Sequence, residues 1–168
     1  MSAPNEKARK LSQACDAAYQ ANKNSCSHAV TAVIQAVHDA TYTHRQANAL
    51  VDWMRINWSE VTLDDGFFGA NQGAVVVGGK KEENANGHVI VIYPGDKIYN
   101  GGYEYFWKKG NKYLTMPRKA QYPRCMSTSI GSWPGSMSCG EKTVWDPWGN
   151  DEKFALVGFW TPTWPLPG

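Results

Sequence analysis

The chain has 168 residues, which is the usual size of one domain and short for two. Seventeen Lys and Arg against fifteen Asp and Glu give a net charge of +2, which indicates neither a nucleic-acid partner nor an acidic tail. No stretch has the apolar core of a cleavable signal or the length of a membrane span. We therefore expect one domain over residues 1–168, with flexible tails at 1–5 and 162–168, made in the cytoplasm and not inserted into a membrane.

Three helices are predicted in the first third of the chain. Apolar residues recur at helical spacing over residues 6–20, which is typical of an amphipathic helix. A polar break follows, where Asn24 or Ser25 can cap a second helix over residues 26–37. The same periodicity predicts a third helix over residues 46–58.

The rest of the chain favours strands. Short runs rich in β-branched and aromatic residues predict strands at 73–78, 88–93, 103–107, 112–115 and 154–160. The first two should pair in antiparallel fashion across a charged solvent loop at 79–87, and the next two across a turn at 108–111. Helices followed by strands predict an α+β fold with the N-terminal helices packed on an antiparallel sheet.

Cys26 is the first candidate for chemistry. A cysteine attacks as its thiolate, and a free thiol with a pKa of about 8.5 is mostly protonated at neutral pH. The first turn of a helix offers unpaired N–H groups and the positive end of the helix dipole, and Cys26 is predicted to lie there. We therefore expect a site that favours the anion, with an imidazolium as the second source of positive charge.

Four histidines could supply that imidazole. His28 follows Cys26 by two residues on the same helix, so its side chain should point away, and His38 and His44 fall at or beyond the far end of that helix. His88 begins a predicted strand behind Gly87, which is small enough to leave space around the ring. A cysteine at a helix start packed against a histidine on a strand is the papain-like arrangement.

Several segments resemble motifs of the type VI secretion amidase effectors, which are peptidoglycan-cutting toxins with an NlpC-type papain-like fold. Their order and spacing also match, and the resemblance covers roughly residues 8–160. The matching segments are 25–30 (SCSHAV), 46–52 (QANALVD), 73–78 (GAVVVG), 87–92 (GHVIVI), 122–131 (YPRCMSTSIG) and 144–145 (VW).

The resemblance implies a cysteine amidase that cuts stem peptides of bacterial cell wall between D-glutamate and the diamino acid, without a cofactor or a metal. Cys26 would be the nucleophile and His88 the base. A third group should orient the imidazole. In NlpC-type enzymes a polar side chain about twelve residues past the histidine has that role, here Asn100; in the first amidase effector family it is a main-chain carbonyl near Cys125.

The resemblance also implies where the protein acts and what it meets. We expect secretion by an apparatus that reads no cleavable signal, action in the periplasm of a target bacterium, and a cognate immunity protein in the producing cell. The aromatic hairpin over residues 99–116 looks like an insertion relative to the first effector family. It could wall the substrate groove or meet an inhibitor, and the sequence leaves both open.

The same residues are open to other interpretations. The same Cys and His could serve another papain-like wall hydrolase, a phage lysin or an acyltransferase, and eight Trp residues also fit a non-catalytic binding module. Cys26 alone could be a core thiol. Asn100 stands before two glycines, so a turn role is equally open. Cys15, Cys125 and Cys139 are core thiols or include one disulfide, and the sequence chooses no pair.

Overall fold

Three N-terminal helices open the structure, a computed structural model that describes residues 3–167, with side chains from residue 6. They are α1 (Ala3–Ala21), α2 (Cys26–Val37) and α3 (Ala47–Asn57). All three predicted helices are confirmed, and α2 has the predicted bounds. Of the predicted flexible tails, residues 1, 2 and 168 lie outside the described residues, and α1 already begins at Ala3.

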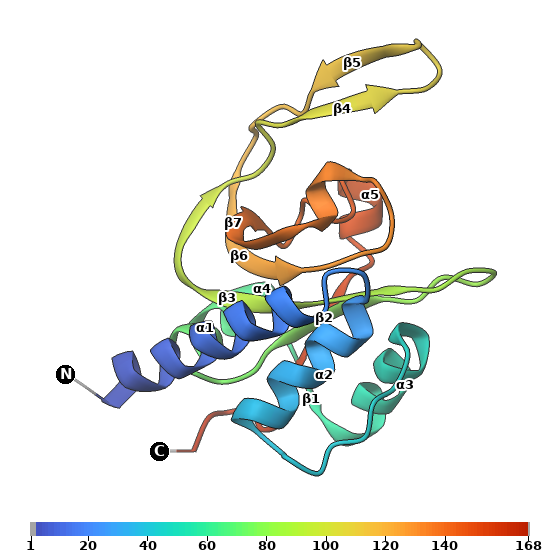
Figure 1. Cartoon of the computed structure of the whole chain (residues 1–168). Coiled ribbons are helices and arrows are strands. Elements are labelled where there is room, and N and C mark those ends of the chain that lie inside the picture. The colour runs from blue at the N-terminus through green and yellow to red at the C-terminus, as the bar shows by residue number, and fades with distance from the viewer. Residues whose placement is uncertain (1–2, 168) are drawn as a thin grey trace.

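A six-stranded antiparallel sheet carries these helices (Figure 1). Its strand order is β1-β8-β2-β3-β6-β7, and β3 lies between β2 and β6. The strands are β1 (Ser59–Val61), β2 (Val77–Lys80), β3 (His88–Tyr99), β6 (Gln121–Ser127), β7 (Ser138–Thr143) and β8 (Gly158–Thr161). Two short helices, α4 (Leu63–Asn71) and α5 (Asp151–Phe154), and the single turn η1 (Pro134–Ser136) complete the sheet domain. The α+β prediction, with helices on an antiparallel sheet, is confirmed.

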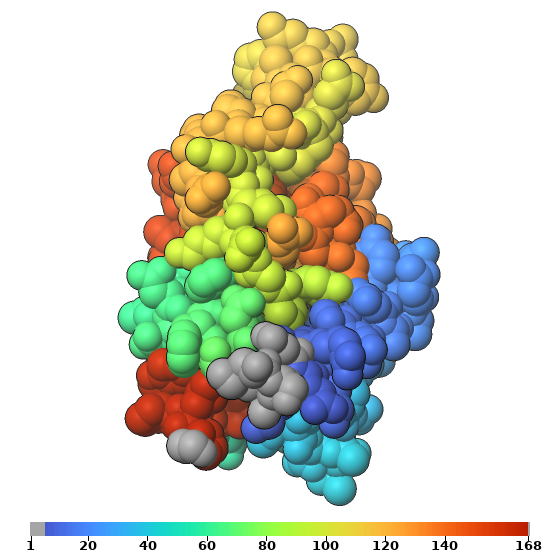
Figure 2. All heavy atoms as spheres, turned by 90° about the vertical axis from the view of Figure 1, so that its left-hand side faces the viewer, coloured from blue at the N-terminus to red at the C-terminus, as the bar shows by residue number. Residues whose placement is uncertain are grey.

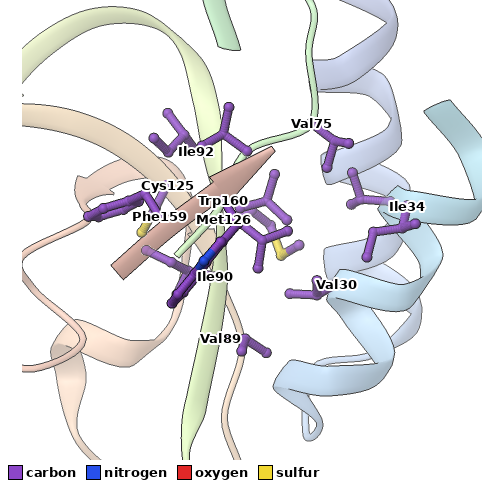
Figure 3. Close-up of a cluster of buried hydrophobic side chains, with 14 of the residues drawn as sticks. Val30, Ile34, Val75, Val89, Ile90, Ile92, Cys125, Met126, Phe159 and Trp160 are labelled. Atoms are coloured by element: carbon purple, nitrogen blue, oxygen red, sulfur yellow. The ribbon is translucent and has the colours of Figure 1, made fainter. Parts of the chain in front are cut away.

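The hydrophobic core fixes α2 against the middle of the sheet (Figure 3). Val30 and Ile34 of α2 point toward Val89 and the neighbouring side chains of β3, and all of them are buried. Ile90 and Ile92 point to the other face of the strand, as the two-residue period requires. Because β3 is buried on both faces, its apolar run is continuous and its first residue has a fixed place beside α2.

The hairpin predicted near residue 110 is confirmed, and it stands apart from the sheet. Strands β4 (Glu104–Trp107) and β5 (Lys112–Thr115) pair only with each other, and Figure 1 and Figure 2 show them projecting from the body of the molecule. Gly101 and Gly102, with φ of +73° and +87°, start the hairpin where β3 ends. Only glycine adopts that left-handed backbone without strain.

Some sequence-based predictions of elements were wrong. Residues 154–160 are not one strand, because α5 ends at Phe154 and β8 begins only at Gly158. Residues 73–78 form a strand only from Val77 onward. Helix α4 was not predicted; it begins after Thr62, whose hydroxyl accepts the N–H of Asp65 at 3.1 Å. No helix within residues 3–167 has the length and hydrophobicity needed to cross a bilayer.

Candidate active site

Cys26 is the first residue of α2, and Ser25 is its N-cap. The Ser25 hydroxyl accepts the main-chain N–H of His28 at 3.3 Å, which satisfies one of the free donors at the helix start. The Cys26 side chain is half-buried and packs against the core. The local sequence therefore produces the predicted position, with a thiol in the first turn of a capped helix.

Burial and main-chain donors act on this thiol in opposite directions. Burial raises the pKa of Cys26 above its ordinary value, whereas the main-chain N–H groups of Val89, Ser27 and Cys26 itself lower it, and burial is the larger effect. The expected preference for the thiolate is therefore not met, and the resting thiol is protonated. Because Val89 follows His88 directly, its N–H also marks where the sulfur lies, at the meeting of α2 with the start of β3.

The ring of His88 is held by a serine that the sequence analysis did not single out. His88 Nε2 and Ser127 Oγ are 2.9 Å apart, and the Ser127 hydroxyl donates to the main-chain oxygen of Ser136 at 2.7 Å. Since a hydroxyl has one proton, Ser127 must accept from His88, so Nε2 carries the ring proton. Nδ1 is then the unprotonated nitrogen, which can accept a proton.

The surroundings of His88 keep the imidazole neutral. Burial lowers the pKa of His88 to about 4, and the edge-on indole of Trp148, whose ring centre is 5.4 Å from the imidazole centre, is part of that cover. Trp148 is itself 9% exposed. Burial thus gives a protonated thiol at the start of α2 and a neutral imidazole at the start of β3, rather than a preformed ion pair.

Asn48 organises the loop that leads into His88. From α3 its side-chain amide donates to the carbonyls of Glu82 at 2.9 Å and Ala85 at 3.1 Å, and its oxygen accepts the N–H of Glu82 at 3.1 Å. A β-carbon on Gly87 would overlap the Asn48 side chain. Glycine is therefore needed at position 87 because the Asn48 side chain packs against it. The prediction that Gly87 leaves space around the imidazole was wrong.

A pocket of about 260 Å³ opens beside His88. Two tryptophans, Trp133 and Trp148, line it, and both charge signs occur around it, with Glu82 on one loop and Lys153 on α5. Its other lining residues are Asn86, Gly87, Ser129, Gly131, Ser136 and Pro147. The pocket can therefore receive a small ligand that has both an apolar part and charged groups, next to the imidazole.

Neither residue predicted as the third group lies at the ring. Asn100 comes after the last residue of β3, twelve positions from His88, and its side-chain oxygen accepts the N–H groups of Lys119 and Ala120 at 2.9 and 3.1 Å. The carbonyl of Cys125 accepts the Ser138 hydroxyl at 3.1 Å, and Cys125 pairs with Ile92, well along the strand from its start. Asn100 closes the base of the hairpin, and the group at Nε2 is two residues beyond Cys125 on the same strand.

Two other histidines lie close to the start of α2. His28 and His44 stack with ring centres 3.8 Å apart, and His44 Nε2 is 3.0 Å from the Ser27 hydroxyl. The chain after α2 returns to the first turn of that helix, which the sequence spacing of His44 did not predict. His38 packs edge-on against Trp58 at 5.9 Å, away from Cys26.

All four cysteines are free thiols. Cys15 and Cys125 are buried, and the Cys139 thiol donates to Asp16 at 3.2 Å, so no disulfide joins any two of Cys15, Cys125 and Cys139. Within the described part of the chain, no three His, Cys, Asp or Glu side chains are grouped so that they could hold a metal ion.

No protein-family model and no curated protein matches this chain.

Proposed function

We propose that the protein is a papain-like cysteine amidase that hydrolyses stem-peptide amide bonds of bacterial peptidoglycan. One observation carries the proposal: the Cys26 thiol, at the start of a capped helix, meets the first residues of β3, where Ser127 fixes His88 in the tautomer that leaves Nδ1 free. This combination is what a cysteine nucleophile and its base require.

The chemistry proceeds in two halves. The Cys26 sulfur attacks the amide carbonyl carbon while its proton passes to His88 Nδ1, and the main-chain N–H of Cys26 stabilises the developing oxyanion. The protonated His88 then gives that proton to the departing amine, which leaves an acyl group on sulfur. A water molecule that has lost a proton to His88 attacks the thioester, and the released acid and the free thiol restore the starting state.

The pocket supports a stem peptide as the substrate. A bond between D-glutamate and a diamino acid has carboxylates and an amine within a few atoms of the amide. Lys153 and Glu82 offer one charge of each sign beside His88, and Trp148 covers the apolar side. We assign Lys153 to a substrate carboxylate and Glu82 to the free amine of the diamino acid.

Digestion of purified sacculi tests the reaction. After incubation with the protein, soluble fragments are separated and their masses determined, with the Cys26→Ala variant as the matched control. New stem-peptide ends that require Cys26 are the expected result, and their masses identify the bond. Unchanged sacculi at high enzyme concentration would refute the proposal. Acyl transfer to an added amine without hydrolysis would instead favour the acyltransferase alternative.

We further propose that the protein acts as an antibacterial toxin in the periplasm of a target cell, with an immunity protein in the producer. The resemblance of the motifs around Cys26 and His88 to secreted amidase effectors supports this. Expression in a test bacterium with and without an added export signal checks it. Lysis should need both the signal and Cys26; equal toxicity of the Cys26→Ala variant would favour a non-catalytic binding module.

A further inference from the structure

The hairpin β4–β5 is an exposed aromatic surface that the amidase chemistry does not use. Trp107, Phe106 and Tyr113 are 41%, 45% and 69% exposed at positions where a solvated hairpin would ordinarily have polar side chains. A lone two-stranded hairpin is marginally stable by itself, and these exposed rings add no core packing to stabilise it. Exposed apolar side chains of this kind are typical of a binding surface.

Hydrogen bonds hold the base of this hairpin rigidly beside the pocket. Buried Asp146 accepts the N–H of Gly101 at 2.9 Å and the hydroxyl of Tyr103 at 2.8 Å through one carboxylate oxygen. The main-chain oxygen of the same residue accepts the indole N–H of Trp133 at 2.7 Å. Since Trp133 lines the pocket at His88, the hairpin and the pocket share one anchor.

One face of the hairpin continues the pocket wall. The pairs Tyr105↔Leu114 and Trp107↔Lys112 share this face because side chains alternate along a strand, and Phe106 and Tyr113 lie on the other. Tyr105 meets Trp133 edge-on at 5.3 Å, so aromatic rings run from the pocket toward the hairpin tip. We call Tyr105, Trp107, Leu114 and Lys112 the hairpin platform.

The ring of Trp107 is held flat on the hairpin. It lies against Gly110, where even a β-carbon would overlap it, and the Lys112 amine is 5.7 Å from its centre. These contacts restrict the rotation of the Trp107 side chain, so the outer face of its indole faces solvent in a fixed orientation. Such a preorganised ring suits stacking on a flat apolar surface, such as the face of a sugar ring.

The charge of the hairpin selects an anionic ligand. Residues 103–119 contain five Lys and Arg and one Glu, a net +4, so the rest of the chain, with twelve basic and fourteen acidic residues, has a net −2. Lys108 and Lys109 follow Trp107 in the turn at the tip, and Lys112 pairs with Trp107 across the hairpin. A polymer with sugar rings and regularly spaced carboxylates would satisfy both the ring and the lysines.

We propose that the hairpin platform binds the glycan strand of peptidoglycan while a stem peptide occupies the pocket at His88. This inference rests on the proposed function, whose substrate it specifies as the wall polymer rather than free stem peptide. Sugar rings stack on Trp107 and Tyr105. The lysines at the tip contact carboxylates of the stem peptides on the same strand, or free lactyl carboxylates where a stem peptide has been removed. A glycan is favoured over a nucleic acid because the net positive charge of the chain comes from residues 103–119, while the rest of the chain has a net charge of −2.

Binding measured with the Cys26→Ala protein tests this without cleavage. In that background Trp107→Ala should weaken co-sedimentation with sacculi by at least tenfold, and Gly110→Ala, which displaces the ring but removes no aromatic group, should weaken it by a smaller factor. The matched control is Phe106→Ala with Tyr113→Ala on the opposite face, which should bind as the parent does. Glycan strands freed of stem peptides should compete, and their binding should weaken as salt is raised.

The inference would be overturned by unchanged binding of the Trp107→Ala variant, by equal loss on both faces of the hairpin, or by competition from single-stranded DNA but not from the glycan strands. Circular dichroism of each variant confirms that the fold is intact. Failure here is distinct from failure of the proposed function. Cleavage of sacculi by unmodified protein with no effect of Trp107→Ala refutes only the platform, and platform-dependent binding without any cleavage refutes only the amidase.

Discussion

Ser127 accepts a hydrogen bond from His88 Nε2 at 2.9 Å and donates its own hydroxyl hydrogen bond to the Ser136 carbonyl at 2.7 Å. Two neighbouring strands, β3 and β6, thus supply the imidazole and the hydroxyl that orients it. The arrangement sets the ring tautomer through a hydroxyl and a main-chain carbonyl, and not through a carboxylate or amide hydrogen-bonded to the imidazole. His88 remains neutral at rest, and its tautomer follows because the only proton of the Ser127 hydroxyl is already donated to the Ser136 carbonyl.

Replacing Ser127 by alanine removes the acceptor that selects this tautomer. We expect kcat on peptidoglycan fragments to fall by about 100-fold, at the low end of what a positioned acid–base contributes, with a smaller change in KM. Ser127→Thr keeps the hydroxyl and should recover part of the loss. Thermal unfolding is the check on structure, because the uncovered Ser136 carbonyl costs about 1–3 kcal/mol. A drop in stability with unchanged kcat would mean that Ser127 serves the fold alone.

The low pKa of His88 predicts a dependence of stability on pH. Burial lowers the pKa of His88 in the folded protein from 6.5 to about 4, so the folded state binds fewer protons than the unfolded state between these values. The stabilising effect of the neutral ring is complete above pH 6.5 and is lost as the pH falls toward 4, to a total of at most about 3 kcal/mol. Chemical denaturation at several pH values measures it.

Two variants isolate the contribution of this histidine. His88→Gln should flatten the stability profile over the same pH interval. Trp148→Ala uncovers the ring, so the His88 pKa followed by NMR should rise toward its ordinary value. An unchanged pKa in the Trp148 variant would assign the lowering to other groups around the ring.

Alkylation tests the protonation state of Cys26. Because the pKa of Cys26 is raised from 9.0, the rate of its reaction with iodoacetamide should climb with pH and reach no plateau below about pH 9. Mass spectrometry of the labelled peptide separates Cys26 from Cys139, the other half-buried thiol. A plateau near neutral pH would reveal a preformed thiolate and contradict the neutral resting pair.

Asn48 should control activity through the loop before His88. Asn48→Ala removes three hydrogen bonds to the main chain of residues 82 and 85, which predicts faster amide hydrogen exchange over 81–87 and a several-fold loss of kcat/KM. Asn57→Ala is the matched control, since its amide bonds only the Trp53 carbonyl on the same helix at 2.9 Å. Equal effects of the two substitutions would rule out a special role for the loop.

Local rules predicted the elements whose signals lie within a few residues. The run from Cys26 to Val37 has both a cap and a helical period, and the two hairpin strands have a turn between aromatic runs. Strand β6 was missed because Pro123 stands inside it and proline disfavours a central strand. Strand β7 was missed because its residues, with Gly140 at φ +93°, resemble a loop. Both strands owe their pairing to neighbours far away in the chain.

The sequence by itself determined the helix that begins at Cys26, the strand that begins at His88 and the α+β class, because caps and periodicity act within one or two turns. Only the tertiary structure decided that Ser127 rather than Asn100 meets the imidazole, since that choice depends on the register between β3 and β6 and on a strand that carries His88 away from Asn100. The protonation states of Cys26 and His88 were likewise decided by burial, which arises from the packing of Trp148 and the core and which no local sequence pattern encodes.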